Sequence, residues 1–169
     1  MHSEYRFLLD QANNDRSVGA IVVSGEGDSF CVGGDSQALQ GHSARGSYDS
    51  GVSSDIALPG YGIDERFDAT FAYHYGLNKP IIAAINGAAA GVGLALAAFA
   101  DIRFAVPKAK LTTAHGKLNL PAEYGLSWVL PRIVGLGRAN DLLLTSRVFL
   151  SEEAEKIGFV NQLFSSEQL

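Results

Sequence analysis

The sequence is poor in cysteine and has no block of basic residues. A single cysteine, Cys31, excludes an internal disulfide within the 169 residues and fits a reducing, cytoplasmic location. Lysine and arginine total 13 against 18 acidic residues, which gives a formal net charge of −5. Without a Lys/Arg-rich run, neither nucleic acid nor an anionic membrane is expected as a partner. No group of His, Cys and carboxylate residues has metal-ligand spacing, so no metal is expected either.

A secretory signal peptide is not expected either, because the first residues given, MHSEYRFLLDQ, are polar and amphipathic. The most apolar stretch, residues 81–100, is long enough to cross a bilayer. It contains Asn86 and several glycines, however, and is packed with alanine. We therefore expect a buried strand, a loop and a helix in this stretch rather than a membrane span.

What remains is an ordinary globular composition, with 47% hydrophobic and 18% charged residues. The length suits one domain over residues 1–169. Strand and helix patterns alternate along the chain, which predicts an α/β domain with mostly parallel strand pairing. Glycine and serine are frequent in residues 37–62, as in a loose surface segment. Strands are expected at 19–24, 81–86, 101–106, 111–114 and 159–164, and helices at 3–13, 94–99, 123–133, 139–145 and from Ser151, as N-cap, to Gly158.

Two glycine-rich segments each follow an apolar run, which predicts two strand-to-turn units. The first is FCVGGD (residues 30–35) after AIVVSG, and the second is GAAAGVG (residues 87–93) after IIAAIN. A helix N-terminus carries unsatisfied N–H groups, and small residues beside it let a polarised oxygen approach the backbone. Two such turns can each direct one N–H at the same oxygen, which would form an oxyanion hole.

Other interpretations of the glycines are less favoured. The segment GVGLAL lacks the third glycine of the dinucleotide-binding pattern, and no G-x-x-x-x-G-K-[ST] phosphate loop occurs. Close packing of a helix on a strand remains the alternative for either turn taken alone.

In three segments the sequence resembles the crotonase family, the enoyl-CoA hydratase/isomerase superfamily. These segments are SFCVGGD, KPIIAAINGAAAGVGLALAAFADIRFA and LPRIVGLGRANDLLLTSRVFLSEEAEKIGFVNQLF. The resemblance implies a ClpP/crotonase-like spiral of ββα units and an acyl-CoA thioester substrate, with no cofactor besides the coenzyme A that the substrate carries. It also implies that the backbone N–H groups of Gly34 and Val92 form the oxyanion hole. The residues expected around the bound substrate are Cys31, Gly33, Asp35, Gly91 and Gly93.

The acid–base residues depart from those of the hydratases in this family. Hydratases use two glutamates, and this chain has Ala95 and His115 at those positions. One carboxylate, Glu123, lies where the segment LNLPAEYG is similar to isomerases of the family. The resemblance therefore favours Glu123 as the base of a 3-enoyl-CoA to 2-enoyl-CoA isomerase. His115 is expected either as a second acid–base group or as a residue that shapes the pocket.

The surroundings of Glu123 are expected to act on its pKa in opposite directions. Apolar neighbours such as Leu120, Leu126 and Trp128 would raise the pKa and improve the base. The start of the predicted helix would lower it. For the aromatic segment Phe71–Tyr75, FAYHY, packing within a helix is favoured over a lining of the acyl tunnel.

Three other functions remain open: a hydratase that uses Glu123 with His115, a dienoyl-CoA isomerase, and a non-catalytic protein that binds acyl-CoA or a partner subunit. The resemblance also implies that the chain lacks the leading β-hairpin and the trailing helices of the family. Exposed apolar edges would then favour self-association, and the family assembly implies a homo-oligomer, either a trimer or a dimer of trimers.

Overall fold

The computed structural model of the protein describes residues 2–34, 67, 71–122 and 124–169. The predicted loose segment 37–62 lies outside these ranges, as do two candidate site residues, Asp35 and Glu123.

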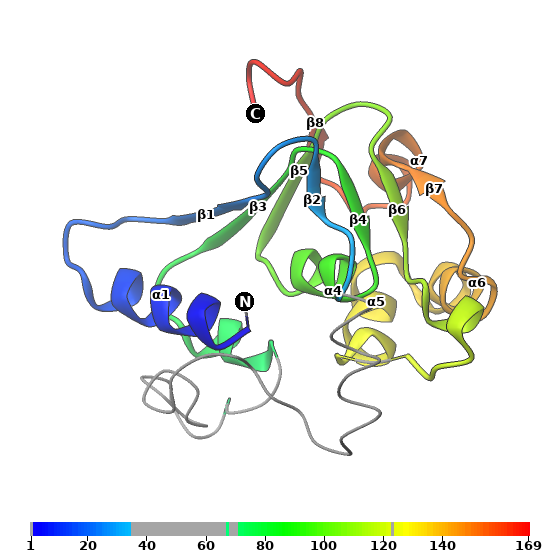
Figure 1. The fold of residues 1–169 in the computed structure, drawn as a ribbon, viewed down its shortest axis with the longest axis horizontal. Coiled ribbons are helices and arrows are strands. Elements are labelled where there is room, and N and C mark those ends of the chain that lie inside the picture. Colours follow the sequence, from blue (N-terminus) through cyan, green and yellow to red (C-terminus); the bar gives the residue numbers. More distant parts are fainter. Residues whose placement is uncertain (1, 35–66, 68–70, 123) are drawn as a thin grey trace.

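In the described residues the strands form two four-stranded sheets, with the orders β1-β3-β5-β8 and β2-β4-β6-β7. All neighbouring strands pair in parallel except β6 and β7, which are antiparallel. From β1 to β6 successive strands fall in alternate sheets, so the chain winds as a spiral (Figure 1). The predicted α/β fold with mostly parallel pairing is confirmed. The strands are β1 (Ile21–Ser24), β2 (Ser29–Cys31), β3 (Ile81–Ile85), β4 (Ala88–Ala90), β5 (Ile102–Ala105), β6 (Lys110–Thr112), β7 (Phe149–Leu150) and β8 (Gln162–Leu163).

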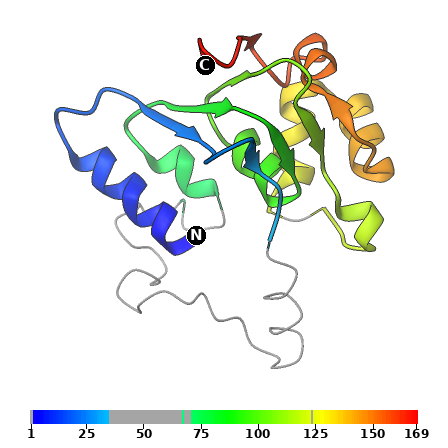
Figure 2. The ribbon, with the colours of Figure 1, turned by 45° about the horizontal axis from the view of Figure 1, so that its top comes forward.

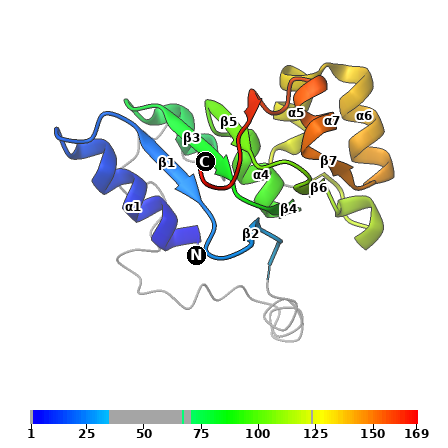
Figure 3. The same ribbon diagram turned by 90° about the horizontal axis from the view of Figure 1, so that it is seen from above.

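The helices lie on both sides of this pair of sheets. Helix α1 lies beside β1 at one end of the molecule, and α5, α6 and α7 gather at the other end (Figure 3). Helix α4 lies between these groups, where it contacts β2, β4 and α5. The helices are α1 (His2–Asn14), α4 (Val92–Ala98), α5 (Leu126–Val134), α6 (Leu136–Thr145) and α7 (Ser151–Lys156), with short 3-10 helices η2 (Ala72–Gly76) and η3 (His115–Leu118).

Helix α4 forms the centre of the core, and all its residues are buried. Its small side chains let it approach strand β2 very closely. A Cβ added at Gly93 would lie 1.9 Å from the carbonyl oxygen of Cys31. Two other glycines enclose the same stretch of chain, because added Cβ atoms at Gly25 and Gly87 would lie 2.0 Å from the carbonyl oxygens of Ser29 and Asp28. The backbone of residues 28–31 therefore packs directly against three glycines.

A buried histidine joins the first helix to the core. The Tyr5 hydroxyl lies 3.1 Å from His74 Nε2, and His74 Nδ1 lies 3.1 Å from the Phe99 carbonyl oxygen. Because a carbonyl only accepts, Nδ1 carries the proton and Nε2 accepts from Tyr5. Burial lowers the pKa of His74 to about 4, so the ring is neutral at pH 7. The predicted packing role of the FAYHY segment is confirmed for Tyr73 and His74, which are both buried.

Several element boundaries differ from the sequence-based expectation. The predicted glycine turn after residue 86 contains a strand, β4, because Ala88–Ala90 pairs with β2 and β6. The prediction that Ser151 is an N-cap is wrong: Leu150 holds that position, and the Ser151 hydroxyl accepts a hydrogen bond from the Ala109 N–H at 3.1 Å. The hydroxyl thus joins α7 to the residue before β6 instead of closing its own helix.

Three further elements differ from the expectation, two in length and one in the type of helix. The helix predicted from residue 123 begins at Leu126, the residue after Gly125, which has a φ of 77°. The strand predicted over 159–164 comprises Gln162–Leu163, and the helix expected in the aromatic segment Phe71–Tyr75 is the 3-10 helix Ala72–Gly76.

We predict that Gly93→Ala destabilises the fold by about 3 kcal/mol, because the added methyl group overlaps the backbone of β2. Gly137 in α6 is the matched control, since among the described residues nothing lies within 4 Å of its added Cβ. Gly137→Ala should leave stability unchanged or raise it by up to about 1 kcal/mol. Urea unfolding measures both, and equal stability of Gly93→Ala and the wild type would contradict the packing role.

Candidate active site

The candidate site lies where three neighbouring strands of the second sheet end. Strands β2, β4 and β6 are adjacent and parallel, so their carboxyl ends meet at one edge of the sheet (Figure 2). The segment Val32–Gly34 follows β2, Gly91 follows β4, and the segment Thr113–His115 follows β6. In sheets built from parallel strands, this edge is the usual place for a ligand.

A cavity of about 340 Å³ lies at this edge, and we call it the glycine pocket. It brings together both predicted glycine segments, whose lining residues are 56 or more positions apart in the sequence, and His115 from the third strand end. Its lining comprises Val32, Gly33, Gly34, Ala90, Gly91, Val92, Ala114, His115, Leu118, Leu120 and Tyr124.

The two glycine segments present backbone to the pocket. Gly33 has a φ of 110° and Gly91 a φ of 54°, which side chains disfavour. The Gly91 N–H donates to the Thr112 carbonyl at 3.1 Å and so belongs to the sheet. Val92 is the first residue of α4, and the first N–H groups of a helix have no acceptor inside it. Val92, rather than Gly91, is therefore the residue whose N–H is available to a ligand.

Two residues predicted to surround the substrate have a packing function. Gly93 faces the Cys31 backbone, and the described lining of the glycine pocket includes neither residue. Cys31 is half-buried in β2, next to the segment that carries Gly33 and Gly34. These residues hold the two turns at their close spacing.

His115 lies in the wall of the pocket and is 4% exposed. It begins η3, directly after Ala114, whose φ is 63°. Its N–H donates to the Thr113 carbonyl at 2.8 Å, and its carbonyl accepts from the Leu120 N–H at 3.0 Å. The backbone on both sides of His115 is thus fixed by hydrogen bonds.

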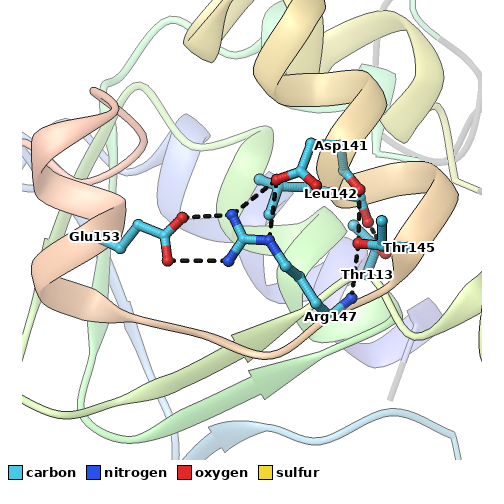
Figure 4. A network of polar contacts seen from close by, with 6 residues as sticks. All are labelled: Thr113, Asp141, Leu142, Thr145, Arg147 and Glu153. Carbon is cyan, nitrogen blue, oxygen red and sulfur yellow. Dashed lines mark hydrogen bonds and ion pairs between the residues drawn. The ribbon is translucent and has the colours of Figure 1, made fainter.

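A buried hydroxyl network anchors this loop to the end of α6. The Ser146 hydroxyl accepts from the Gly116 N–H at 2.8 Å and lies 3.0 Å from the Thr113 hydroxyl. Thr113 in turn donates to the Leu142 carbonyl at 2.9 Å (Figure 4). Ser146 is fully buried and has a φ of 46°, so the chain holds a strained residue in place to make these bonds.

The next residue, Arg147, joins α6 to α7. Its guanidinium lies 2.8 Å from Asp141 and 2.5 Å from Glu153 (Figure 4). Both carboxylates hold the pKa of Arg147 above its ordinary value. Each pair is partly exposed and contributes about 1 kcal/mol or less, so the bridge steadies the segment rather than determines the fold.

Sequence reasoning missed Tyr124 as a lining residue of the pocket. Tyr124 has a φ of 55°, and a tyrosine in the sequence gives no indication of such a left-handed backbone conformation. Tyr124 directly follows the candidate base, Glu123. Ala114, which directly precedes His115, also has a positive φ, so a residue in this conformation adjoins each of the two candidate acid–base residues. Ala95, at the position of a hydratase glutamate, is fully buried inside α4.

The part of the chain that the structure describes contains no cluster of three or more His, Cys, Asp and Glu side chains that would hold a metal ion. Its helices are all too short or too polar to cross a bilayer.

Comparison with known proteins identifies the family. The profile of the enoyl-CoA hydratase/isomerase family matches residues 1–169, and the chain belongs to this family, also called the crotonases. It is 38% identical over 164 residues to the "Probable enoyl-CoA hydratase EchA12" of Mycobacterium tuberculosis, covering 95% of this chain and 55% of that protein. It is 31% identical over 169 residues to the 1,2-epoxyphenylacetyl-CoA isomerase of Escherichia coli, covering 100% and 61%.

The solved structures agree with this assignment. The enoyl-CoA hydratase/isomerase of Pseudoalteromonas atlantica superposes with a TM-score of 0.79 at 27% identity, covering 99% of this chain and 60% of that one. The chain therefore has the crotonase-like fold and spans less than two thirds of the length of each of these relatives.

We predict that Ser146→Ala lowers the unfolding free energy by about 1–3 kcal/mol, because the Gly116 N–H loses its buried acceptor. The exposed neighbour Thr145 is the control, and Thr145→Ala should cost roughly 0.5 kcal/mol. Chemical denaturation monitored by circular dichroism provides the comparison. Equal losses in the two variants would show that the buried network is not what anchors the loop.

Proposed function

We propose that the protein is an acyl-CoA isomerase that moves the double bond of a 3-enoyl-CoA thioester to the 2-position. The observation that supports this most is the convergence of Gly34, Val92 and His115 in the glycine pocket, at the carboxyl edge of one sheet. The N–H groups of Gly34 and Val92 would hold the thioester oxygen. The chemistry requires such donors because negative charge collects on that oxygen when C2 loses a proton.

The reaction needs one base that both removes and returns a proton. Glu123 would take a proton from C2, the electron pair of that C–H bond would form a C1–C2 double bond, and the carbonyl electron pair would move onto the thioester oxygen. The result would be a dienolate conjugated with the C3–C4 double bond, whose electrons take up the proton at C4 when the carbonyl forms again. The same carboxyl group would then deliver the proton to C4, which leaves a conjugated C2–C3 double bond. Proton and electrons balance without water or a cofactor, and Glu123 ends as the carboxylate that it was at the start.

Neither position at which the hydratases of the family have a catalytic glutamate is a carboxylate in this chain, and this favours the one-base reaction. Hydration in the family relies on glutamates where this chain has Ala95 and His115. Ala95 is fully buried and has no group that can hold a water molecule. His115 lines the pocket with its backbone fixed on both sides, so it would shape the site around the acyl group.

Hydration is the second candidate function, and His115 is the observation that favours it. Its imidazole ring is of a type that exchanges protons near pH 7 and lies in the wall of the pocket. With Glu123 it would provide two acid–base groups, and the relative from M. tuberculosis is named as a hydratase. The two functions differ in outcome, because hydration of the conjugated product removes its ultraviolet absorbance and isomerisation alone does not.

We predict that Glu123→Gln reduces isomerisation by about 10²–10⁴-fold, because the amide cannot accept the C2 proton. The assay follows the absorbance of the conjugated thioester after a 3-enoyl-CoA is added to the purified protein. Glu26→Gln, at an exposed position, is the charge-matched control and should retain full activity. Wild-type activity in Glu123→Gln would remove Glu123 as the base.

We predict that Val92→Pro reduces the isomerisation rate by about 10²–10³-fold, because proline removes one oxyanion donor. Proline is well tolerated at the first position of a helix, so the fold should survive. Val92→Ala also shortens the side chain but keeps the N–H, and it should stay within a few-fold of wild type. If both variants lose activity equally, the side chain matters and the N–H does not.

A further inference from the structure

A second cavity of about 570 Å³ lies beside the glycine pocket, and we call it the aromatic chamber. It lies between η2, the end of α4 and the start of α5. Phe67, Ala72, Tyr75, Phe99, Tyr124, Gly125 and Trp128 line it, and five of these seven residues are aromatic. Its volume falls in the range of cavities that hold small organic ligands.

Ring contacts hold the chamber walls in place. The Tyr75 ring packs against Phe99 at 5.5 Å and against Trp128 at 6.0 Å between centroids. Arg132 also packs on Trp128, with its guanidinium 4.0 Å from the centre of the Trp128 ring. Because these rings are tilted relative to one another, the chamber wall presents both ring faces and ring edges. Aromatic rings pack favourably in such tilted and edge-to-face arrangements, so the wall suits a further planar ring better than a flexible alkyl chain.

Of the described lining residues, the two cavities share Tyr124. Its ring contacts Phe71 at 5.9 Å, and Phe71 is buried in the core. Its backbone has a φ of 55° and is followed by Gly125 at 77°, a conformation that glycine or asparagine adopts more easily. A large aromatic side chain is thus held in strained backbone where, among the described residues, the linings of the pocket and the chamber overlap.

We propose that Tyr124 determines the acyl specificity of this protein and that the aromatic chamber takes a planar aromatic ring at the end of the acyl group. The inference rests on the proposed function, because a thioester held in the glycine pocket directs its acyl group past Tyr124. Trp128 and Tyr75 then form the outer wall against the ring. Neither residue is among the described residues that line the glycine pocket, so these two side chains select the substrate without taking part in proton transfer.

Binding of unreactive thioesters tests this inference apart from the chemistry. Calorimetry on the full chain would compare 4-phenylbutanoyl-CoA with decanoyl-CoA, which match in acyl carbon number and have no double bond to move. We expect the phenyl thioester to bind about tenfold more tightly to the wild type. Equal affinity, or tighter binding of decanoyl-CoA, would overturn the proposal.

Two variants test whether the preference for the phenyl thioester depends on the aromatic chamber, and a third variant is the control. Tyr124→Gly removes the shared ring and suits the backbone, and Trp128→Leu changes a half-exposed side chain of the chamber wall that is not part of the buried core. Both should lose most of the preference for the phenyl thioester, while Leu144→Ala, at an exposed position outside the chamber, should keep it. A preference that survives in both chamber variants would contradict the assignment.

The two proposals can fail separately. A phenyl preference that depends on Tyr124, in a protein that isomerises no 3-enoyl-CoA, would support the chamber and contradict the proposed reaction. Isomerisation of aliphatic 3-enoyl-CoA with no phenyl preference in binding would support the reaction and overturn the chamber.

Discussion

The close contact between strand β2 and three glycines is the constraint on which the rest of the structure depends. Gly25, Gly87 and Gly93 each bring backbone or helix against residues 28–31, at distances that exclude a methyl group. Packing of this kind sets the position of β2 relative to β4 and to the start of α4. Since Val32–Gly34 follows β2 directly and Val92 begins α4, the same contact fixes the spacing of the two segments that meet in the glycine pocket.

The remaining wall of the pocket is fixed from the opposite end of the molecule. Strand β6 is the third parallel neighbour, and its last residues enter the hydroxyl network of Thr113 and Ser146. Ser146 is the C-cap residue of α6, and Arg147 then links α6 to α7. The C-terminal helices therefore position His115, although they contribute no side chain to the described pocket lining. The site is a product of both halves of the described chain.

More of the candidate site than of the exact bounds of the strands and helices could be predicted from the sequence. The glycine segments were visible as patterns, and parallel pairing predicts that strand ends meet, so their convergence could be expected. Strand β4 was missed because Ala88–Ala90 has no β-branched or aromatic residue and forms a strand only through its neighbours. The Ser146 network and the position of Tyr124 were also missed. Both depend on positive φ in non-glycine residues, and only tertiary contacts stabilise that conformation.

Polarisation of a thioester carbonyl by two backbone N–H groups is the central claim of this account. The most direct test is the infrared carbonyl stretch of a ¹³C-labelled, unreactive acyl-CoA, recorded free and bound to the protein. The account predicts a shift of the band to lower frequency on binding, and a smaller shift in Val92→Pro than in Val92→Ala. A bound thioester whose carbonyl stretch stays at the position of the free ligand would contradict it.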